Sequence, residues 1–348
     1  MFYYNPVKIN FDIDYIKVCE LVQTNSILLV TSKSFYTNGV IDSIASKLSS
    51  KIKNVVYDIR SNPDINFTKS LKQNDDYEEI IALGGGSVLD TAKYLAVKGA
   101  INEDLKNNTL NPSDQAQFVP IYAIPTTSGT SSELTKWATL WDYKNNMKMS
   151  LMHEKLYSKH AIYDINLTLS LSRQLTIYTA LDVFSHSIES IWNKNENYIS
   201  TNYALQSMDL ILHYLPKLVD DLQNTTYRKY ITLASVYAGL AFSNTQTALA
   251  HALSYPITMK YGLAHGLACS FTIPILIECI NDKHVSSILI PYKDKINSLF
   301  KKLNISNNLA DYGIDREFID EIFLNLNSRA KNGVFDLDAT KKKILYSL

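Results

Sequence analysis

The chain has 348 residues, 46% of them hydrophobic and 20% charged, a composition typical of a folded protein with about two domains. Lysine plus arginine and aspartate plus glutamate both number 34, so there is no basic excess and we expect no nucleic-acid partner. The three cysteines form neither a disulfide framework nor a CxxC pair, and no segment resembles a signal peptide or a membrane span, so we expect a cytoplasmic protein without membrane contact.

The first half of the chain alternates strand-like and helix-like segments. The β-rich runs occupy residues 26–31, 54–57, 79–83 and 119–124, and a helical stretch covers residues 90–97. Such alternation is typical of a parallel sheet that helices cover on both faces. We therefore predict an α/β domain over residues 1–168.

The second half of the chain has the periodicity of helices. Apolar residues recur at spacings of three and four over residues 172–192, 202–218 and 227–241. The last stretch, residues 281–348, is polar and rich in lysine and asparagine, which favours peripheral helices joined by surface loops. We predict an all-α domain over residues 169–348, and we expect any metal ligands on its facing helices.

A glycine loop follows the third β-rich run. Gly84, Gly85, Gly86 and Ser87 lead directly into the helical stretch, so the backbone can approach a ligand closely. The first N–H groups of a helix attract phosphate groups. The run is not a GxGxxG fingerprint, because Leu89 stands where the third glycine would be. The alternative is a tight strand–helix turn that binds no ligand.

A second loop, residues 124–133, also follows a strand and contains six hydroxyl side chains and one glycine. Loops at the carboxyl ends of parallel strands are where α/β proteins bind nucleotides. The alternative is a loop that uses its hydroxyl groups to cap a helix.

One aspartate and three histidines of the second half form a candidate metal site. Asp182 and His186 are four residues apart in a helical run, so they share a face, whereas His251 and His265 lie further along the chain. One carboxylate with three imidazoles suits Fe²⁺ or Zn²⁺. The alternative is that each histidine is a hydrogen-bonded core residue. Glu189, on the same helix as His186, is expected to support the site rather than to bind the metal.

Taken together, these segments resemble the iron-containing alcohol dehydrogenase family. Residues 84–93 look like the family's GGGSxxDxAK motif and residues 125–133 like its PTTxGTxSE loop, and the resemblance extends from about residue 26 to residue 280. It implies a dinucleotide-binding α/β domain followed by a helical domain, with the active site between them. It also implies reduction of a small aldehyde by NADH or NADPH with Fe²⁺, or alternatively Zn²⁺.

The resemblance assigns roles to individual residues. It places Asp182, His186, His251 and His265 at the positions of the metal ligands. The residues that it leads us to expect at the cofactor are Ser32, Asn62, Gly85, Gly86, Ser87, Asp90, Thr126, Thr127, Thr135 and Lys148.

Two positions depart from the family's pattern. Ser32 stands where the family often has an aspartate, so a carboxylate that would repel a 2′-phosphate is absent and NADPH becomes an alternative to NADH. Tyr255 stands where many relatives have a second histidine. Its phenol can donate a hydrogen bond or relay a proton, which makes it the candidate catalytic residue, but packing beside the cofactor is an equal alternative.

Residues 135–142 and 251–256 look like the branch of the family that reduces phosphonoacetaldehyde to 2-hydroxyethylphosphonate. Lys136 and Lys260 are candidates for binding the dianionic phosphonate. Trp137 and Phe242 are expected to shape the substrate pocket. The alternatives are a general iron-dependent alcohol dehydrogenase for another short aldehyde or diol, a dehydroquinate synthase-like lyase, and a non-catalytic binding protein. The expected partner is a small molecule, with a homodimer as an assembly to be tested.

Overall fold

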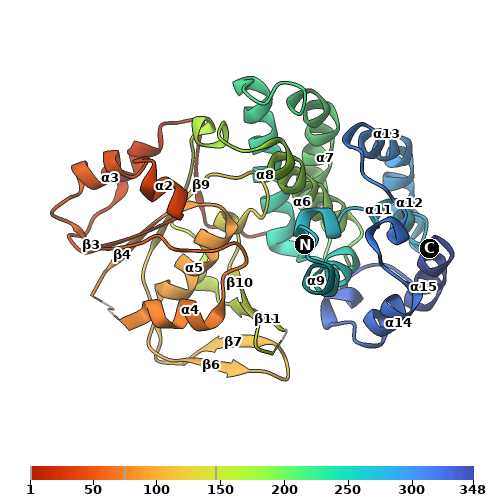
Figure 1. Ribbon diagram of the computed structural model, residues 1–348, viewed down its shortest axis with the longest axis horizontal. Helices are drawn as coiled ribbons and strands as arrows, with labels where there is room; N and C mark the ends of the chain where they lie inside the picture. The colour runs from red at the N-terminus through yellow and green to blue at the C-terminus, as the bar shows by residue number, and fades with distance from the viewer. Residues whose placement is uncertain (1, 74–75, 146) are drawn as a thin grey trace. The chain divides into compact units, whose positions relative to one another are not determined.

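The computed structural model describes residues 2–73, 76–145 and 147–348 (Figure 1). Contacts between residues divide these into two compact units. The sheet unit comprises Asn5–Thr127 and Ser131–Thr168, and the helical unit comprises residues 2–4, Ser128–Thr130 and Leu169–Leu348. The prediction of an α/β domain with a parallel sheet followed by a helical domain is confirmed.

The sheet unit is built on a six-stranded sheet in which all neighbouring strands are parallel. In spatial order its strands are β1 (Lys8–Phe11), β12 (His160–Tyr163), β9 (Ile121–Pro125), β4 (Glu79–Gly84), β2 (Ile27–Thr31) and β3 (Ile52–Val56). The four β-rich runs of the sequence correspond to β2, β3, β4 and β9. The short strands β1 and β12 extend the sheet beyond them.

Successive residues of the central strands point to opposite faces of this sheet, and both faces are buried. In β2, Leu28 and Val30 belong to one apolar cluster and Ile27 and Leu29 to the other. Two groups of helices cover these faces (Figure 1). The first group is α4 (Ile65–Ser70) and α5 (Gly86–Ala96), and the second is α1 (Val18–Leu21), α2 (Lys33–Thr37) and α3 (Asp42–Lys47).

A smaller sheet, which the sequence did not predict, belongs to the same unit. Its strands in spatial order are β10 (Trp137–Asp142), β11 (Met147–Met152), β7 (Thr109–Pro112) and β6 (Ile101–Asp104), and β5 (Val97–Lys98) pairs separately with β8 (Gln117–Phe118). β10 contacts α5, so the small sheet packs beside the glycine-loop helix. Strands of two to six residues carry too little alternation to be distinguished from loops by pattern alone.

Three long helices form the centre of the helical unit, and each begins at a side-chain cap. Ser172 caps α6 (Arg173–Ile191), Asn197 caps α7 (Tyr198–Leu218) in a capping box with Ser200, and Asn224 caps α8 (Thr225–Thr245). Each cap oxygen accepts a hydrogen bond from a backbone N–H group that has no partner within the helix.

These three helices enclose one large apolar core, to which the remaining helices contribute. The others are α9 (Leu249–Tyr261), α10 (His265–Ala268), α11 (Ile273–Ile277), α12 (Lys283–Leu289), α13 (Lys293–Leu303), α14 (Arg316–Leu324) and α15 (Leu337–Tyr346). Within the described part of the chain, no helix is both long enough and apolar enough to cross a membrane.

A glycine brings α10 against α6. A Cβ atom on Gly266 would lie 1.8 Å from the backbone oxygen of Tyr178, so only glycine permits this approach. Because His265 precedes Gly266 and Asp182 follows Tyr178 by one turn of α6, this contact sets the distance between two candidate metal ligands.

We expect Gly266→Ala to lower the free energy of unfolding by about 3 kcal/mol, the upper end of the usual cost of overpacking a core, because the new Cβ atom would meet a backbone oxygen. Thermal unfolding of the metal-free protein measures this. The control is Gly262→Asn, because Gly262 has φ +66° with no atom within 4 Å of a Cβ, and asparagine tolerates the left-handed region. Equal stability of Gly266→Ala and wild type would contradict this account of the helix contact.

Candidate active site

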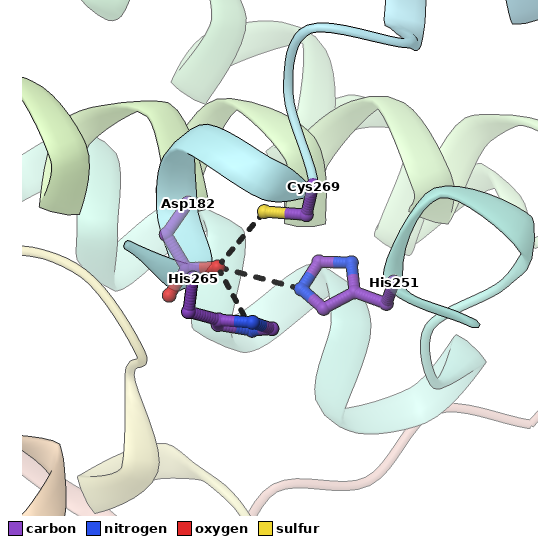
Figure 2. Close-up of side chains that lie close together, drawn as sticks. All are labelled: Asp182, His251, His265 and Cys269. Carbon is purple, nitrogen blue, oxygen red and sulfur yellow. Dashed lines mark hydrogen bonds and ion pairs between the residues drawn. The ribbon is translucent and has the colours of Figure 1, made fainter. Parts of the chain in front are cut away.

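The carboxylate of Asp182 lies at the centre of a buried cluster in the helical unit. Its Oδ1 atom is 3.8 Å from His186 Nε2, 3.4 Å from His251 Nε2 and 3.8 Å from His265 Nε2. Figure 2 shows the aspartate on α6, with His251 and His265 directed toward it from α9 and α10. The structure thus brings the three predicted histidines within 3.8 Å of the Asp182 carboxylate, although His186 does not belong to the group of donor atoms that lie within 4.8 Å of one another.

The protonation states of Asp182 and His186 suit a metal ion. The pKa of Asp182 lies below its usual range, because the surrounding imidazoles outweigh the effect of burial, which by itself would raise it. Burial lowers the pKa of His186 to about 3. An ionised carboxylate and a neutral imidazole are the forms that coordinate a cation. Burial would lower the pKa of His251, but the Glu189 and Asp182 carboxylates raise it to about 9, so a cation that binds this imidazole displaces a proton.

Glu189 orients one of these imidazoles. Its Oε2 atom is 2.6 Å from His251 Nδ1, and its two oxygens also accept from the backbone N–H groups of Ala248 and His251. The opposite ring atom, His251 Nε2, is buried and has no hydrogen-bond partner among the described residues, yet it faces Asp182. A histidine held by a carboxylate at one nitrogen and directed at a cation with the other is typical of metal sites, so these residues fit a metal ion.

Figure 2 also shows Cys269, which the sequence did not suggest as a site residue. Its Sγ atom lies 3.5 Å from Asp182 Oδ1, and one donor atom each from Asp182, His251, His265 and Cys269 lie within 4.8 Å of one another. The spacing of four between His265 and Cys269 was the available signal, since one helical turn brings such side chains to the same side, and Cys269 is the C-cap of α10. In the metal-free chain, burial raises the pKa of the Cys269 thiol.

We expect His251→Ala to lose most of its bound divalent metal. The substitution removes His251 Nε2, which faces Asp182 and has no hydrogen-bond partner among the described residues. Elemental analysis of metal per chain after dialysis measures this. His213→Ala is the control, because His213 lies exposed on α7 beside Lys217. Full metal content in His251→Ala would remove this residue from the ligand set.

Aromatic rings flank the cluster. Phe242 stacks on His186 with ring centroids 4.0 Å apart, and Tyr255 stacks on His265 with centroids 5.4 Å apart and the planes inclined by 8°. Burial raises the pKa of Tyr255 to about 12, so its phenol is protonated at neutral pH and can donate a hydrogen bond. Arg329 Nη1 lies 3.4 Å from that hydroxyl group.

The glycine loop of the sheet unit has the geometry of a phosphate-binding turn. β4 ends at Gly84, and Gly85 is the N-cap of α5, where no side chain can bind the first N–H groups of the helix. A Cβ atom on Gly84 would lie 2.5 Å from a methyl group of Val88, and one on Gly85 would lie 3.3 Å from the side chain of Thr127. The residues present therefore fit a dinucleotide whose phosphates approach the start of α5.

Other expected cofactor residues gather around this turn. The backbone N–H of Asn62, which has φ 55°, donates to Ser87 Oγ at 3.1 Å. The backbone N–H of Thr126 donates to Gly84 O at 3.1 Å, so the second loop lies beside the first. Ser32, at the end of β2, uses its hydroxyl to cap α2 by accepting from Phe35 N at 3.3 Å.

Lys93, on α5, is a buried cation that holds the second loop in place. Its Nζ atom donates to the carbonyl oxygens of Ser132, Thr135 and Trp137 at 2.6–2.8 Å and lies 3.0 Å from Thr135 Oγ1. Asp90, one turn earlier, accepts from Ser132 Oγ at 2.6 Å and from Thr139 N at 2.9 Å. Asp90 and Thr135, both expected at the cofactor, thus make hydrogen bonds within the sheet unit that hold the second loop against α5.

Burial lowers the pKa of Lys93 to about 8, against the opposing effect of the Asp90 and Glu133 carboxylates. An unfolded lysine has a pKa of about 10.4, so between these values the unfolded chain binds more protons than the folded chain. The contribution of this group to stability therefore rises with pH from about 8 to about 10.4.

We expect Lys93→Met to lack this rise, so that wild type gains stability relative to the variant as the pH increases through this interval. Urea unfolding at a series of pH values measures the difference. In Lys33→Met, which changes an exposed lysine of α2, the difference from wild type should stay constant. A constant difference for Lys93→Met as well would show that Lys93 has an ordinary pKa.

The candidate substrate lysines have other partners. Lys136 forms an ion pair with Glu154, and Lys260 Nζ lies 4.1 Å from the centre of the Phe318 ring. Trp137 begins β10, and Lys148, on the neighbouring strand β11, pairs in register with Trp141. The substrate role of Lys136 and Trp137 and the cofactor role of Lys148 stay predictions.

Comparisons with known proteins agree with this arrangement. The family model described as "Iron-containing alcohol dehydrogenase" matches residues 6–165, and that described as "Fe-containing alcohol dehydrogenase family, C-terminal" matches residues 176–289. A sulfoacetaldehyde reductase of Bilophila wadsworthia is 31% identical over 286 residues, covering 72% of this chain and 73% of that protein. A phosphonoacetaldehyde reductase of Streptomyces viridochromogenes is 32% identical over 205 residues, covering 57% of this chain and 52% of that protein.

Among solved structures, the sulfoacetaldehyde reductase of Bifidobacterium kashiwanohense in complex with NAD⁺ is similar along its full length. The TM-score is 0.88 at 25% identity, and the match covers 99% of this chain and 98% of that chain.

Proposed function

Because the chain belongs to the iron-containing alcohol dehydrogenase family and is an iron-dependent alcohol dehydrogenase, we propose that it reduces phosphonoacetaldehyde to 2-hydroxyethylphosphonate with NADH or NADPH. The observation that carries the metal-dependent part of this proposal is the largely buried cluster of Asp182, His186, His251 and His265, in which His251 Nε2 has no hydrogen-bond partner among the described residues. The cytoplasm, where the cofactor is dissolved, is the compartment that we propose.

When bound, the iron ion supplies Lewis-acid polarisation of a carbonyl group and the nicotinamide supplies hydride. The chain's own contribution begins with holding the ion. Asp182 would contribute the negative charge, and the three imidazoles would contribute nitrogen donors from α6, α9 and α10, His251 after losing the proton that it carries at neutral pH. Glu189 keeps the His251 ring in one orientation, so little reorganisation is needed when the charge on the substrate oxygen grows.

Tyr255 is the residue that we propose for moving a proton. Its ring lies against His265, and burial keeps its pKa at about 12, so the hydroxyl is a donor at neutral pH. A donor beside the ligand set can give a proton to the oxygen of the product or relay one from water.

The start of α5 is where we propose that the dinucleotide phosphates bind, with Gly85, Gly86 and Ser87 in contact with them. The remaining candidates around this site are Ser32, Asn62, Asp90, Thr126, Thr127, Thr135 and Lys148. Ser32 supports use of NADPH as well as NADH, because a hydroxyl group does not repel a 2′-phosphate as a carboxylate would.

The choice of substrate is supported by the relatives. Two similar proteins are named for two-carbon aldehydes that carry an anionic head group, a sulfonate in one and a phosphonate in the other. Phe242 and Trp137 are the aromatic residues that we propose for shaping the pocket, and Lys136 is the sequence's candidate for binding the head group.

We expect the iron-loaded protein to oxidise NADH or NADPH in proportion to the amount of phosphonoacetaldehyde added. The absorbance of the reduced nicotinamide measures this, with sulfoacetaldehyde and propanal as competing substrates and with each cofactor tested separately. Preference for propanal would favour a general alcohol dehydrogenase. Conversion of substrate without net consumption of cofactor would favour a lyase that recycles it and would contradict the proposal.

A further inference from the structure

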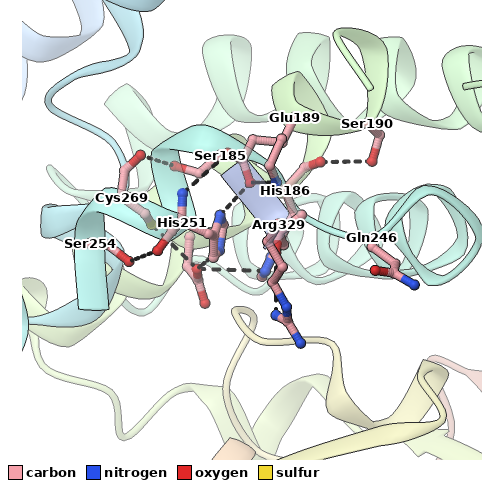
Figure 3. Close-up of polar contacts among 12 residues, drawn as sticks. Ser185, His186, Glu189, Ser190, Gln246, His251, Ser254, Cys269 and Arg329 are labelled. Atoms are coloured by element: carbon pink, nitrogen blue, oxygen red, sulfur yellow. Dashed lines mark hydrogen bonds and ion pairs between the residues drawn. The ribbon is translucent and has the colours of Figure 1, made fainter. Parts of the chain in front are cut away.

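We propose that Arg329 binds the anionic head group of the substrate, so that the enzyme selects small aldehydes that carry a phosphonate or a sulfonate. This inference rests on the proposed reduction of an aldehyde at the Asp182 cluster. It concerns a cation that the sequence did not single out and that the structure places beside the candidate metal ligands (Figure 3).

The guanidinium group of Arg329 has few partners. Nη1 lies 3.4 Å from Tyr255 Oη and 3.4 Å from Thr247 Oγ1, and both partners are neutral. Within residues 2–73, 76–145 and 147–348, no carboxylate lies within 4.0 Å of it. A guanidinium group offers five N–H donors, so this half-buried cation retains the capacity to bind an anion.

The position of Arg329 relative to the ligand set is fixed by its surroundings. It lies in the short 3₁₀ helix Ser328–Asn332, which packs on α9. Asn332 Nδ2 donates to the backbone oxygen of Thr247 at 3.0 Å, and Ala330 is buried. Because α9 also carries His251 and Tyr255, the 3₁₀ helix with Arg329 packs directly on one of the elements that position the ligand set.

One residue, Tyr255, contacts both the guanidinium group and the ligand set. Its hydroxyl contacts Arg329, whereas its ring stacks on His265. In phosphonoacetaldehyde and sulfoacetaldehyde, one methylene group separates the charged head group from the carbonyl carbon. In the proposed binding mode, the carbonyl of such a small substrate lies at the ligand set and its head group meets the guanidinium fork.

Three other cations that could bind the head group, Lys136, Lys260 and Arg228, have partners of their own. Lys136 is paired with Glu154, and Lys260 lies over the Phe318 ring. Arg228, also in the helical unit, donates to two backbone oxygens and to Thr176 Oγ1. Arginine also matches the tetrahedral oxygens of a phosphonate or sulfonate better than lysine does, because it can form two parallel hydrogen bonds.

The test compares Arg329→Met and Arg329→Lys with wild type, all loaded with iron. We expect kcat/KM of Arg329→Met to fall about 100-fold for phosphonoacetaldehyde and for sulfoacetaldehyde, as expected for losing hydrogen bonds to a charged group. For propanal we expect a change of less than about threefold, since that aldehyde has no head group to bind. Arg329→Lys should recover part of the loss, and the two anionic aldehydes show which head group the wild type prefers.

Arg316→Met is the matched control, because Arg316 is an exposed arginine of the same unit. Its kinetic constants should equal those of wild type for all three aldehydes. An equal loss for propanal and the anionic aldehydes in Arg329→Met would overturn the inference, because it would mean that Arg329 positions Tyr255 or α9 rather than the head group.

A binding measurement separates this inference from the proposed function. Calorimetric titration with ethylphosphonate, which has no carbonyl group, should show binding to wild type and to Arg316→Met but not to Arg329→Met. Binding that depends on Arg329 supports the anion site even if no aldehyde is reduced. Equal binding by wild type and Arg329→Met, or no binding by either protein, would refute it.

Discussion

The burial of one carboxylate among three imidazoles is the interaction on which the helical unit depends. Asp182 is 4% exposed, and the imidazoles of His186, His251 and His265 outweigh the cost of burying its charge. A bound divalent ion would take over this role, because it would neutralise the carboxylate and accept the lone pairs of the imidazoles. The close packing of α10 on α6 at Gly266 holds His265 near Asp182. The hydrogen bond between Glu189 and His251 fixes the orientation of the His251 ring, so both contacts preorganise the ligand atoms for the ion.

Lys93 and Arg329 differ in their hydrogen-bond partners, and this difference distinguishes a structural role from a functional one. Lys93 uses its ammonium group to donate hydrogen bonds to three carbonyl oxygens, so no N–H donor is left for a ligand. Its role is structural, because it connects α5 to the segment that follows β9. Arg329 makes two long contacts with neutral oxygens through Nη1, and its guanidinium group has three further N–H donors on Nε and Nη2. The same reasoning separates Lys136, neutralised by Glu154, from a cation that is available to a substrate.

Much of the fold follows from local pattern. β2, β4 and β9 alternate between two apolar clusters, and α6, α7 and α8 repeat apolar residues at helical spacing over about five turns, so the sequence predicts each of them. The edge strand β1 and the strands of the small sheet were not predicted, because four to six residues at the margin of a core carry little periodicity. Residue types and local context suggested Asp182, His186, His251 and His265 together as a metal site, with hydrogen-bonded core histidines as the alternative, and the family resemblance then favoured the metal site.

The sequence by itself determined the central strands and the long helices, the two loops rich in glycine or hydroxyl groups, and the residue types that can bind a metal and a dinucleotide. Those properties depend on neighbours within about one turn of helix or one strand. Only the tertiary structure decided that Cys269 and Arg329 lie beside the cluster, and that Asp90 and Thr135 are engaged within the sheet unit. Such contacts join residues 42 to 87 positions apart, and the packing of helices and strands, rather than any local preference, brings them within hydrogen-bond distance.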